Sequence, residues 1–243
     1  MAPRGRAAAV VILIAALLGV AVTVRLGIWQ LDRAAQKLSL QAQIDARRGL
    51  APLDGPGLMR GADAPALQHA RRVVLRGRWL ADRNVFLDNR QMNDLPGFYV
   101  VTPLQLEGQA EAVAVQRGWA PRNFQDRTAL PAVRTPSGAV TVEGVVAPPP
   151  SRLYALGPET GGTIRQNLDL DAYAKETGLV LLPVSVLQSD LSSSAGDGLL
   201  RRWSLPAVDV QKHYGYAFQW FALSALMAGL YVWFQLIRPA RQR

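Results

Sequence analysis

The sequence predicts a membrane α-helical hairpin: two transmembrane helices that carry an α+β, mostly antiparallel β, extracytoplasmic domain. Two apolar segments without charged residues lie near the two ends of the chain, at 7–24 and 214–237. Between them, short segments rich in β-branched residues alternate with turn residues, which is typical of antiparallel strands. One segment with helix start and stop signals lies among these strands and makes the predicted domain α+β.

The first apolar segment, Ala7–Val24, has eighteen residues without a charge. At a rise of 1.5 Å per residue such a helix spans about 27 Å, close to the thickness of bilayer hydrocarbon. A cleaved signal peptide is the alternative, because Arg4 and Arg6 precede the apolar core and Gly19-Val20-Ala21 resembles a cleavage site. The core is longer than the ~7 to 15 residues of a signal peptide. We therefore expect an uncleaved transmembrane helix over residues 7–28.

The second apolar segment, Tyr214–Ile237, has twenty-four residues without a formal charge. Aromatic residues cluster at both of its ends, as they do where helices cross a membrane interface: Tyr214, Tyr216, Trp220, Tyr231 and Trp233. We expect a second transmembrane helix over residues 213–237. Small residues recur at a spacing of four in both segments, which allows close helix contact: Ala15 and Gly19, Ser224 and Ala228, Ala225 and Gly229.

Charge patterning orients the two helices. The chain holds 27 basic and 18 acidic residues, a net charge of +9, and all acidic residues lie between Asp32 and Asp209. Six basic residues flank the apolar segments: Arg4, Arg6, Arg25, Arg238, Arg241 and Arg243. The intervening domain is only +3, which argues against a nucleic-acid partner and leaves the lipid bilayer as the expected surroundings of the ends. Basic flanks mark cytoplasmic ends, so residues 1–6 and 238–243 are predicted to be cytoplasmic and residues 29–212 periplasmic, in a cell inner membrane.

Helical signals continue past the first crossing to about Leu50. Apolar residues recur there at spacings of three and four: Leu31, Ala34, Ala35, Leu38 and Ala42. Glycines and prolines then end the helix and open a predicted linker from Gly49 to about Pro65. Serines and glycines over 192–198 predict a surface loop, and Pro206 marks a short tether into the second crossing.

Six segments of the domain have strand composition: Arg72–Leu80, Val85–Asn89, Phe98–Leu106, Ala112–Trp119, Val140–Val146 and Leu179–Gln188. In the first of them Val73, Leu75 and Trp79 occupy alternate positions, the pattern of a sheet with one solvated face. A helix is predicted over Asp169–Thr177, because it has an acidic start and is closed by Gly178.

The polar residues of the domain offer little catalytic chemistry. The absence of cysteine excludes a disulfide framework and thiolate copper sites. There are two histidines and no hydrolase, phosphate-loop or zinc-protease motif, so we do not expect an enzyme. Asp82, Asp88 and Asp94 could coordinate a hard cation, but turn chemistry is the simpler explanation. We interpret Arg117 and Trp119, at the end of a strand, as serving the fold.

Polar and aromatic residues also gather at the start of the second crossing: Lys212, His213, Tyr214, Tyr216 and Trp220. On a helix, His213 shares a face with Tyr216 and Trp220. Interfacial anchoring is the simpler explanation of these rings, and ligation by His213 is the alternative.

Four motifs occur in order along the chain: Leu26-Gly27-Ile28-Trp29-Gln30-Leu31 followed by Arg33 and Lys37; Asp88-Asn89-Arg90 with Gly97-Phe98-Tyr99-Val100-Val101-Thr102-Pro103; Arg117-Gly118-Trp119-Ala120-Pro121; and His213-Tyr214-Gly215-Tyr216-Ala217-Phe218-Gln219-Trp220-Phe221. Together they resemble the surfeit locus protein 1 family from the first crossing to the second. Two positions depart from the family pattern: Gln36 stands where an aromatic residue is usual, and Gln116 where asparagine is usual.

The resemblance implies an assembly factor for cytochrome c oxidase, a haem-copper respiratory oxidase, that assists insertion of haem a into the catalytic subunit. In some family members haem is bound through the histidine that His213 matches, which makes His213 the expected ligand of the haem iron. Tyr216, Trp220 and Trp29 could form the flat walls of a haem slot. Basic residues at a similar depth in the membrane interface could form ion pairs with the haem propionates: Arg25, Arg33 and Lys212. The alternative is a scaffold or sensor subunit of a membrane complex that acts only by protein contact, without haem.

Overall fold

The structure is a computed structural model that describes residues 3–60, 63–126, 129–154, 161–191, 196–203 and 210–241. The chain divides into two compact units. The helical unit consists of Met1–Gln43 and Pro206–Arg243, and the β-rich unit of Ile44–Leu205. Each unit is described by itself.

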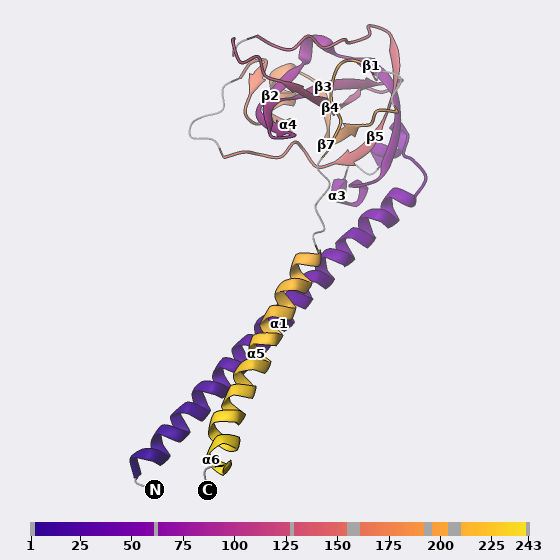
Figure 1. Ribbon diagram of the computed structural model, residues 1–243. Helices are drawn as coiled ribbons and strands as arrows, with labels where there is room; N and C mark the ends of the chain where they lie inside the picture. Colours follow the sequence, from indigo (N-terminus) through magenta and orange to yellow (C-terminus); the bar gives the residue numbers. More distant parts are fainter. Residues whose placement is uncertain are drawn as a thin grey trace. The chain divides into compact units, whose positions relative to one another are not determined.

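The helical unit contains two long helices that run antiparallel, side by side (Figure 1). Its elements are α1 (Pro3–Gly49, which continues into the β-rich unit), α5 (Val210–Val232), the π-helical η2 (Trp233–Ile237) and α6 (Arg238–Arg241). The start of α1 and the short α6 lie at the same end of this unit. By length and composition, Ala7–Gly49 and Val210–Arg241 are candidate membrane spans, with mean hydropathies of 2.8 and 1.6 in their most apolar windows.

Small residues form the contact between α1 and α5. On α1, Thr23, Gly27 and Ala34 are buried. A Cβ atom built on Gly27 would lie 2.7 Å from the ring of Phe221, so only glycine lets the two helices approach this closely. On α5 the buried residues recur every seven positions, at Val210, Ala217 and Ser224. This repeat is typical of the left-handed packing of coiled coils.

The β-rich unit is built on a seven-stranded sheet. Its strands are β1 (Arg72–Trp79), β2 (Val85–Met92), β3 (Leu95–Leu106), β4 (Glu111–Pro121), β5 (Ala139–Ala147), β6 (Ile164–Arg165) and β7 (Val180–Gln188). The strand order is β1-β5-β7-β4-β3-β2-β6, and β1 also pairs with β3, so five strands form a closed sheet. All pairings are antiparallel except β4–β7 and β2–β6. The mostly antiparallel α+β prediction is confirmed.

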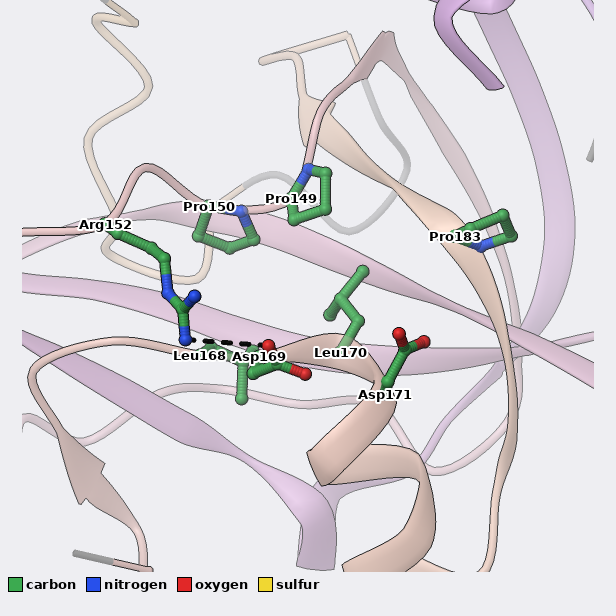
Figure 2. Close-up of a pocket in the computed structure, with 8 residues that line it drawn as sticks. All are labelled: Pro149, Pro150, Arg152, Leu168, Asp169, Leu170, Asp171 and Pro183. Carbon is green, nitrogen blue, oxygen red and sulfur yellow. Dashed lines mark ion pairs between the residues drawn. The ribbon is translucent and has the colours of Figure 1, made fainter. Parts of the chain in front are cut away.

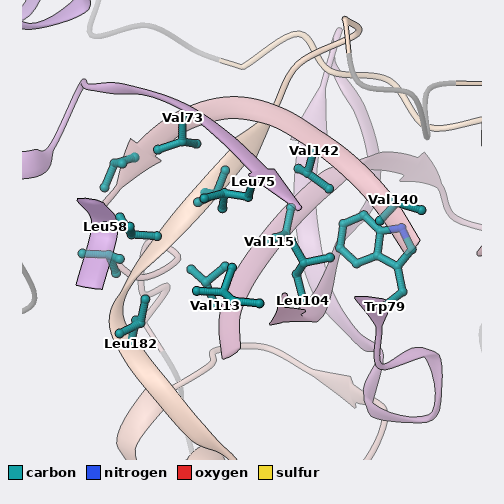
Figure 3. Packing of buried hydrophobic residues seen from close by; sticks show 14 residues of the cluster. Leu58, Val73, Leu75, Trp79, Leu104, Val113, Val115, Val140, Val142 and Leu182 are labelled. Atoms are coloured by element: carbon teal, nitrogen blue, oxygen red, sulfur yellow. The ribbon is translucent and has the colours of Figure 1, made fainter. Parts of the chain in front are cut away.

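The main core lies inside the closed sheet (Figure 3). Residues of β1 alternate between exposed and buried along the whole strand, and Val73, Leu75 and Trp79 point inward as the sequence predicts. Leu58 joins this core and is completely buried. It belongs to α2 (Gly55–Arg60), within the segment predicted to be a linker.

The linker prediction is therefore wrong. The segment packs on the sheet, because α2 contributes Leu58 to the core and Leu53 forms a parallel bridge with Val73 of β1. Two further short helices were also not predicted, α3 (Pro65–Gln68) and η1 (Ala81–Arg83).

The predicted internal helix is confirmed as α4 (Leu170–Thr177). Asp169 caps its N-terminus, because its carboxylate accepts a hydrogen bond from the backbone N–H of Ala172 at 3.0 Å. Gly178 ends the helix in the left-handed conformation, at a φ of 71°.

Three carboxylates that could have formed a cation site serve separate local structures. Asp82 pairs with Arg83 in η1, and Asp88 of β2 pairs with Arg122. Asp94 lies in the β2–β3 hairpin turn, where both Asn93 and Asp94 have positive φ, at 52° and 61°. The predicted loop over 192–198 falls largely outside the described residues, and the predicted tether at Pro206 falls wholly outside them.

Candidate functional site

His213, in the first turns of α5, contacts α1 through a hydrogen bond. Its Nδ1 lies 2.7 Å from Oε1 of Gln30. Gln30 follows Gly27 by three positions, so both face α5 on one side of α1. Both Gln30 and His213 are half-buried.

This contact determines which ring nitrogen is available. An amide oxygen can only accept, so Nδ1 of His213 is the donor, and in the neutral form of the ring Nε2 carries the lone pair. Within the described part of the chain, Nε2 has no hydrogen-bond partner. A neutral imidazole whose second nitrogen donates to a fixed acceptor is the form that binds metals, with the acceptor orienting the ring.

The other predicted site residues lie next to this contact along the two helices: Trp29 and Arg33 flank Gln30 within α1, and Tyr216 and Trp220 follow His213 on α5. Tyr216 is 52% exposed and Trp29 is 43% exposed, while Trp220 is half-buried. The guanidinium of Arg33 stacks over the ring of Trp29 at 5.5 Å. The structure thus brings together Arg33 with Trp29, and His213 with Gln30. Sequence reasoning missed Gln30, although it lies inside the first motif one position after Trp29.

The second and third sequence motifs meet elsewhere, in the β-rich unit, and their contacts there are structural. Nε1–H of Trp119 donates to the carbonyl of Arg90 at 2.9 Å, and Trp119 lies opposite Tyr99 in the β3–β4 ladder. A Cβ on Gly97 would lie 2.5 Å from the indole, so glycine is required under this ring. Trp119 is 2% exposed, which confirms that it belongs to the core.

Arg117 is completely buried and ties a C-terminal segment to the sheet. Its Nη2 donates to Asp197 Oδ2 at 2.8 Å, and its guanidinium lies 4.8 Å from the ring centroid of Trp79. Burial lowers the pKa of Arg117, and the Asp197 carboxylate opposes this by raising the same pKa. Arg201 also donates to both oxygens of Asp197, at 2.7 and 2.8 Å.

The segment that carries Asp197 lies along β4. Leu200 exchanges both backbone hydrogen bonds with Trp119, at 2.7 and 2.9 Å. Nε1–H of Trp203 donates to the carbonyl of Gln188 at 2.8 Å, and its ring packs edge-on against Tyr99. Residues 197–203 therefore form a strap across the sheet, and Arg117 serves the fold as predicted.

Figure 2 shows a hollow of about 360 Å³ at the start of α4 that holds two carboxylates. Asp169 caps the helix and pairs with Arg152 at 3.5 Å, and Asp171 lies in the first turn. The remaining lining is apolar: Pro149, Pro150, Leu168, Leu170 and Pro183. The described lining contains no nucleophile with an adjacent base, so local capping explains its acidic residues.

These features define a class of protein: two candidate membrane-spanning helices, one near each end of the chain, joined to a β-rich domain with a closed sheet. The family model described as "SURF1 family" matches residues 17–225, and the chain belongs to this family.

Relatives occur in eukaryotes and in bacteria. The chain is 27% identical to a SURF1-like protein of Monosiga brevicollis, over 87% of this chain and 82% of the relative. It is 27% identical to surfeit locus protein 1 of Rattus norvegicus, over 86% and 70%. A shorter match of 28% identity, over 39% of this chain and 24% of the relative, is to a Saccharomyces cerevisiae protein named cytochrome oxidase assembly protein SHY1.

Proposed function

We propose that the chain is an integral membrane assembly factor for cytochrome c oxidase. Membership of the SURF1 family and the name of the yeast relative support a role in oxidase assembly. The two candidate spans, flanked by arginines, support insertion in the cell inner membrane with both termini cytoplasmic and residues 29–212 periplasmic. The protein acts by binding and not by catalysis, and its main partner is the catalytic subunit of the oxidase.

The proposed task is to assist insertion of haem a into that subunit. The observation that carries this proposal is the hydrogen bond between Gln30 and His213, which leaves Nε2 of the imidazole available. When bound, the haem would supply an iron that an imidazole nitrogen can ligate, and His213 would hold it. The donor set fits: Gln30 holds the proton on Nδ1 and fixes the ring plane, so Nε2 meets the iron as a neutral ligand.

Neighbouring residues offer the rest of a haem site. The exposed indole of Trp29 and the rings of Tyr216 and Trp220 provide flat apolar surfaces near the contact between Gln30 and His213. Arg33, Arg25 and Lys212 provide cations that attract propionate carboxylates. Their role is to hold the haem without burying it deeply, because a carrier must release its cargo.

Absorption spectroscopy of the purified full chain tests the haem proposal. The protein is made in cells able to synthesise haem a, as the wild type, as His213→Ala, and as His69→Gln, which removes the other histidine of the sequence. We expect a Soret band in the wild type and in His69→Gln, and its loss or shift in His213→Ala. A Soret band unchanged in His213→Ala, or absent from the wild type, would remove His213 from the site.

Deleting the gene tests the broader function. We expect the haem a absorbance of membranes to fall together with oxidase activity, and to recover when the gene is restored. Loss of assembled oxidase with haem binding absent from the purified chain would favour a scaffold that acts by protein contact alone. Unchanged oxidase in the deletion strain would contradict the assembly function.

A further inference from the structure

An exposed apolar stripe lies on α1 beyond its uncharged part. Charged residues resume at Arg25, and after it apolar residues keep the alternating three- and four-residue spacing of a heptad repeat. We call these residues the α1 seam: Ile28, Leu31, Ala35, Leu38 and Ala42. All are exposed, and the three large side chains are exposed by 43%, 39% and 47% in chain order. Such a stripe is typical of a helix that packs against another helix.

The α1 seam lies beside the face of α1 that contacts α5. Gly27 faces the ring of Phe221 and Gln30 bonds to His213, and a seam residue follows each of them by one position. The completely buried Ala34 is likewise followed by a seam residue. One position along a helix is a rotation of about 100°. The seam is therefore roughly a quarter turn away from α5, and the described part of the chain leaves it exposed.

The surroundings of the α1 seam make this exposure costly. In the proposed topology the first crossing covers residues 7–28, so Leu31 to Ala42 lie in water. Inside a bilayer lipid covers apolar side chains, but Leu31 and Leu38 stay in contact with water unless protein covers them. The same spacing continues into the crossing, where every position is apolar: Val24, Ala21, Leu17, Ile14 and Val10. A helix that packs on the seam can therefore follow α1 into the bilayer.

We propose that the α1 seam joins two copies of this chain through a parallel pair of α1 helices. Copies inserted in one membrane with the same topology run in the same direction, so each seam meets the identical seam in register. Leu31 and Leu38 then occupy the d positions, as leucine does in parallel two-stranded coiled coils. Ala35 and Ala42 occupy a positions, where small side chains allow close approach. The proposal uses the membrane insertion of α1 and requires neither haem binding nor the oxidase.

The charges beside the seam agree with a second copy as the occupant. In a parallel pair each g position faces the e position five residues later on the other helix. Gly27 would face Asp32 of the second copy and Ala34 would face Ser39 of the second copy, so no like charges meet. Asp45 holds the next position of the repeat, where two identical carboxylates would face each other. The contact is therefore expected to end before Asp45.

The stripe is large enough for a reversible dimer. With the positions inside the crossing, its exposed apolar surface is roughly 500 to 800 Å² per copy, because a large apolar side chain presents on the order of 100 Å². A standard interface buries about 800 Å² per partner. Inside the bilayer the contact contributes only packing, since lipid covers apolar surface equally well. We therefore expect copies that separate at low protein density in the membrane.

Crosslinking of single cysteines tests the seam, because the chain has no cysteine of its own. Three variants place the thiol on the seam: Ala35→Cys, Leu38→Cys and Ala42→Cys. Three controls place it on other exposed faces of the same helix: Gln36→Cys, Leu40→Cys and Gln43→Cys. Each full chain is produced at low level in two tagged forms in the same cells, and the membranes are oxidised.

We expect disulfide-linked dimers that carry both tags from the seam variants only, because a disulfide requires Cβ atoms about 4 Å apart. Equal crosslinking at all six positions, or none at the seam, would overturn the proposal. So would seam crosslinks that yield only products with a single tag and another protein, because a different helix would then occupy the seam.

Two matched leucines provide a second measurement. Leu38 and Leu40 are 47% and 50% exposed, but only Leu38 belongs to the seam. Energy transfer between copies labelled at Ser137→Cys is followed in liposomes as the protein is diluted with lipid. Leu38→Gln should raise the dissociation constant by about tenfold or more, and Leu40→Gln by less than about threefold. Circular dichroism establishes that both variants keep their helices. Equal effects of the two substitutions, or no transfer in the unsubstituted chain, would contradict the proposal.

Discussion

The indole of Trp119 donates a hydrogen bond to the carbonyl of Arg90, 29 residues earlier in the chain. This bond joins the β2–β3 hairpin to the end of β4, and Gly97 makes room for the ring between them. The second and third of the four sequence motifs therefore meet in one packing unit, although they are separate along the chain. Their shared role is to fix the domain and not to carry a reaction.

Replacing Trp119 should destabilise the domain. Trp119→Ala removes a fully buried ring and should cost about 3 to 5 kcal/mol in the free energy of unfolding. Trp119→Phe keeps most of the packing but leaves the Arg90 carbonyl without its donor, at a cost of about 1 to 3 kcal/mol. Denaturant unfolding and protein abundance in membranes measure both effects. If Trp119→Ala accumulated normally and resisted proteolysis but failed to support oxidase assembly, Trp119 would instead belong to a contact surface.

Removing the Asp197 carboxylate should destabilise the domain about as much as removing the Trp119 ring. The substitution Asp197→Ala leaves the buried guanidinium groups of Arg117 and Arg201 without their shared carboxylate, which should cost about 3 to 5 kcal/mol. Asp190 provides a matched control, because its side chain is 77% exposed and, among the described residues, pairs only with Arg201, at 3.4 Å. Asp190→Ala should change stability by no more than about 0.5 kcal/mol. Comparable losses in the two variants would show that the buried pair has no special role.

Gln30 should position the imidazole of His213. Gln30→Leu removes the acceptor of Nδ1–H, and the affinity for haem should fall by about 10- to 100-fold, as for other outer-sphere partners of metal ligands. The readouts are the haem dissociation rate and the position of the Soret band. Gln219→Leu is the control, because Gln219 is an exposed glutamine of α5. If haem binds and neither readout moves in Gln30→Leu, the hydrogen bond serves only helix packing.

Tyr173 should make the domain sensitive to alkaline pH. Burial raises the pKa of Tyr173 to about 12, and its hydroxyl donates to the carbonyl of Arg83. The folded state therefore keeps its proton where the unfolded state, with a tyrosine pKa near 10, loses it. This stabilisation is fully present below pH ~10 and is lost as the pH rises through ~12.

The measurement is the denaturation midpoint of the wild type and Tyr173→Phe at pH values across this window. The wild type should lose more stability than the variant, by up to about 2 to 3 kcal/mol. The tyrosinate absorbance of the folded wild type should include one late-titrating residue that is missing from Tyr173→Phe. Parallel stability curves for the two proteins would contradict this.

The two candidate spans can be oriented by labelling single cysteines, since the chain has none of its own. Ser137→Cys, in an exposed segment of the β-rich unit, should react with a membrane-impermeant thiol reagent in intact spheroplasts. Gly5→Cys, at the start of α1, should react only after the membrane is opened. The reverse labelling would invert the proposed topology.

Local signals explain what the sequence predicted well. Val73, Leu75 and Trp79 alternate with polar residues, and this pattern predicts strand β1 because one face of the strand must be buried. Asp169 and Gly178 delimit α4 because a helix end needs a cap. Leu58 could not be placed in the core from the sequence, since six residues bounded by glycine and arginine show no periodicity. The two-residue β6 and the closure of β1 onto β3 depend on contacts between distant segments.

The candidate site was predictable to a similar extent. His213 stood out by its residue type and its position at the start of an apolar segment. Its partner Gln30 lies 183 positions away on the other long helix. A polar residue next to an interfacial tryptophan is usually interpreted as solvent-exposed, so the sequence did not single out Gln30. Only the register of α1 against α5, set by Gly27 and Phe221, brings the two side chains together.

The strap of residues 197–203 has a mechanical consequence. It holds the chain by an ion pair, two backbone hydrogen bonds and the indole of Trp203, which is seven positions before Val210, where α5 begins. Tension applied along α5 reaches this strap before it reaches any strand of the closed sheet. The Trp203 bond to Gln188 would bear that tension first, then the Leu200 bonds to Trp119 and last the Arg117–Asp197 pair, so three contacts must yield in turn before the pull passes beyond the strap.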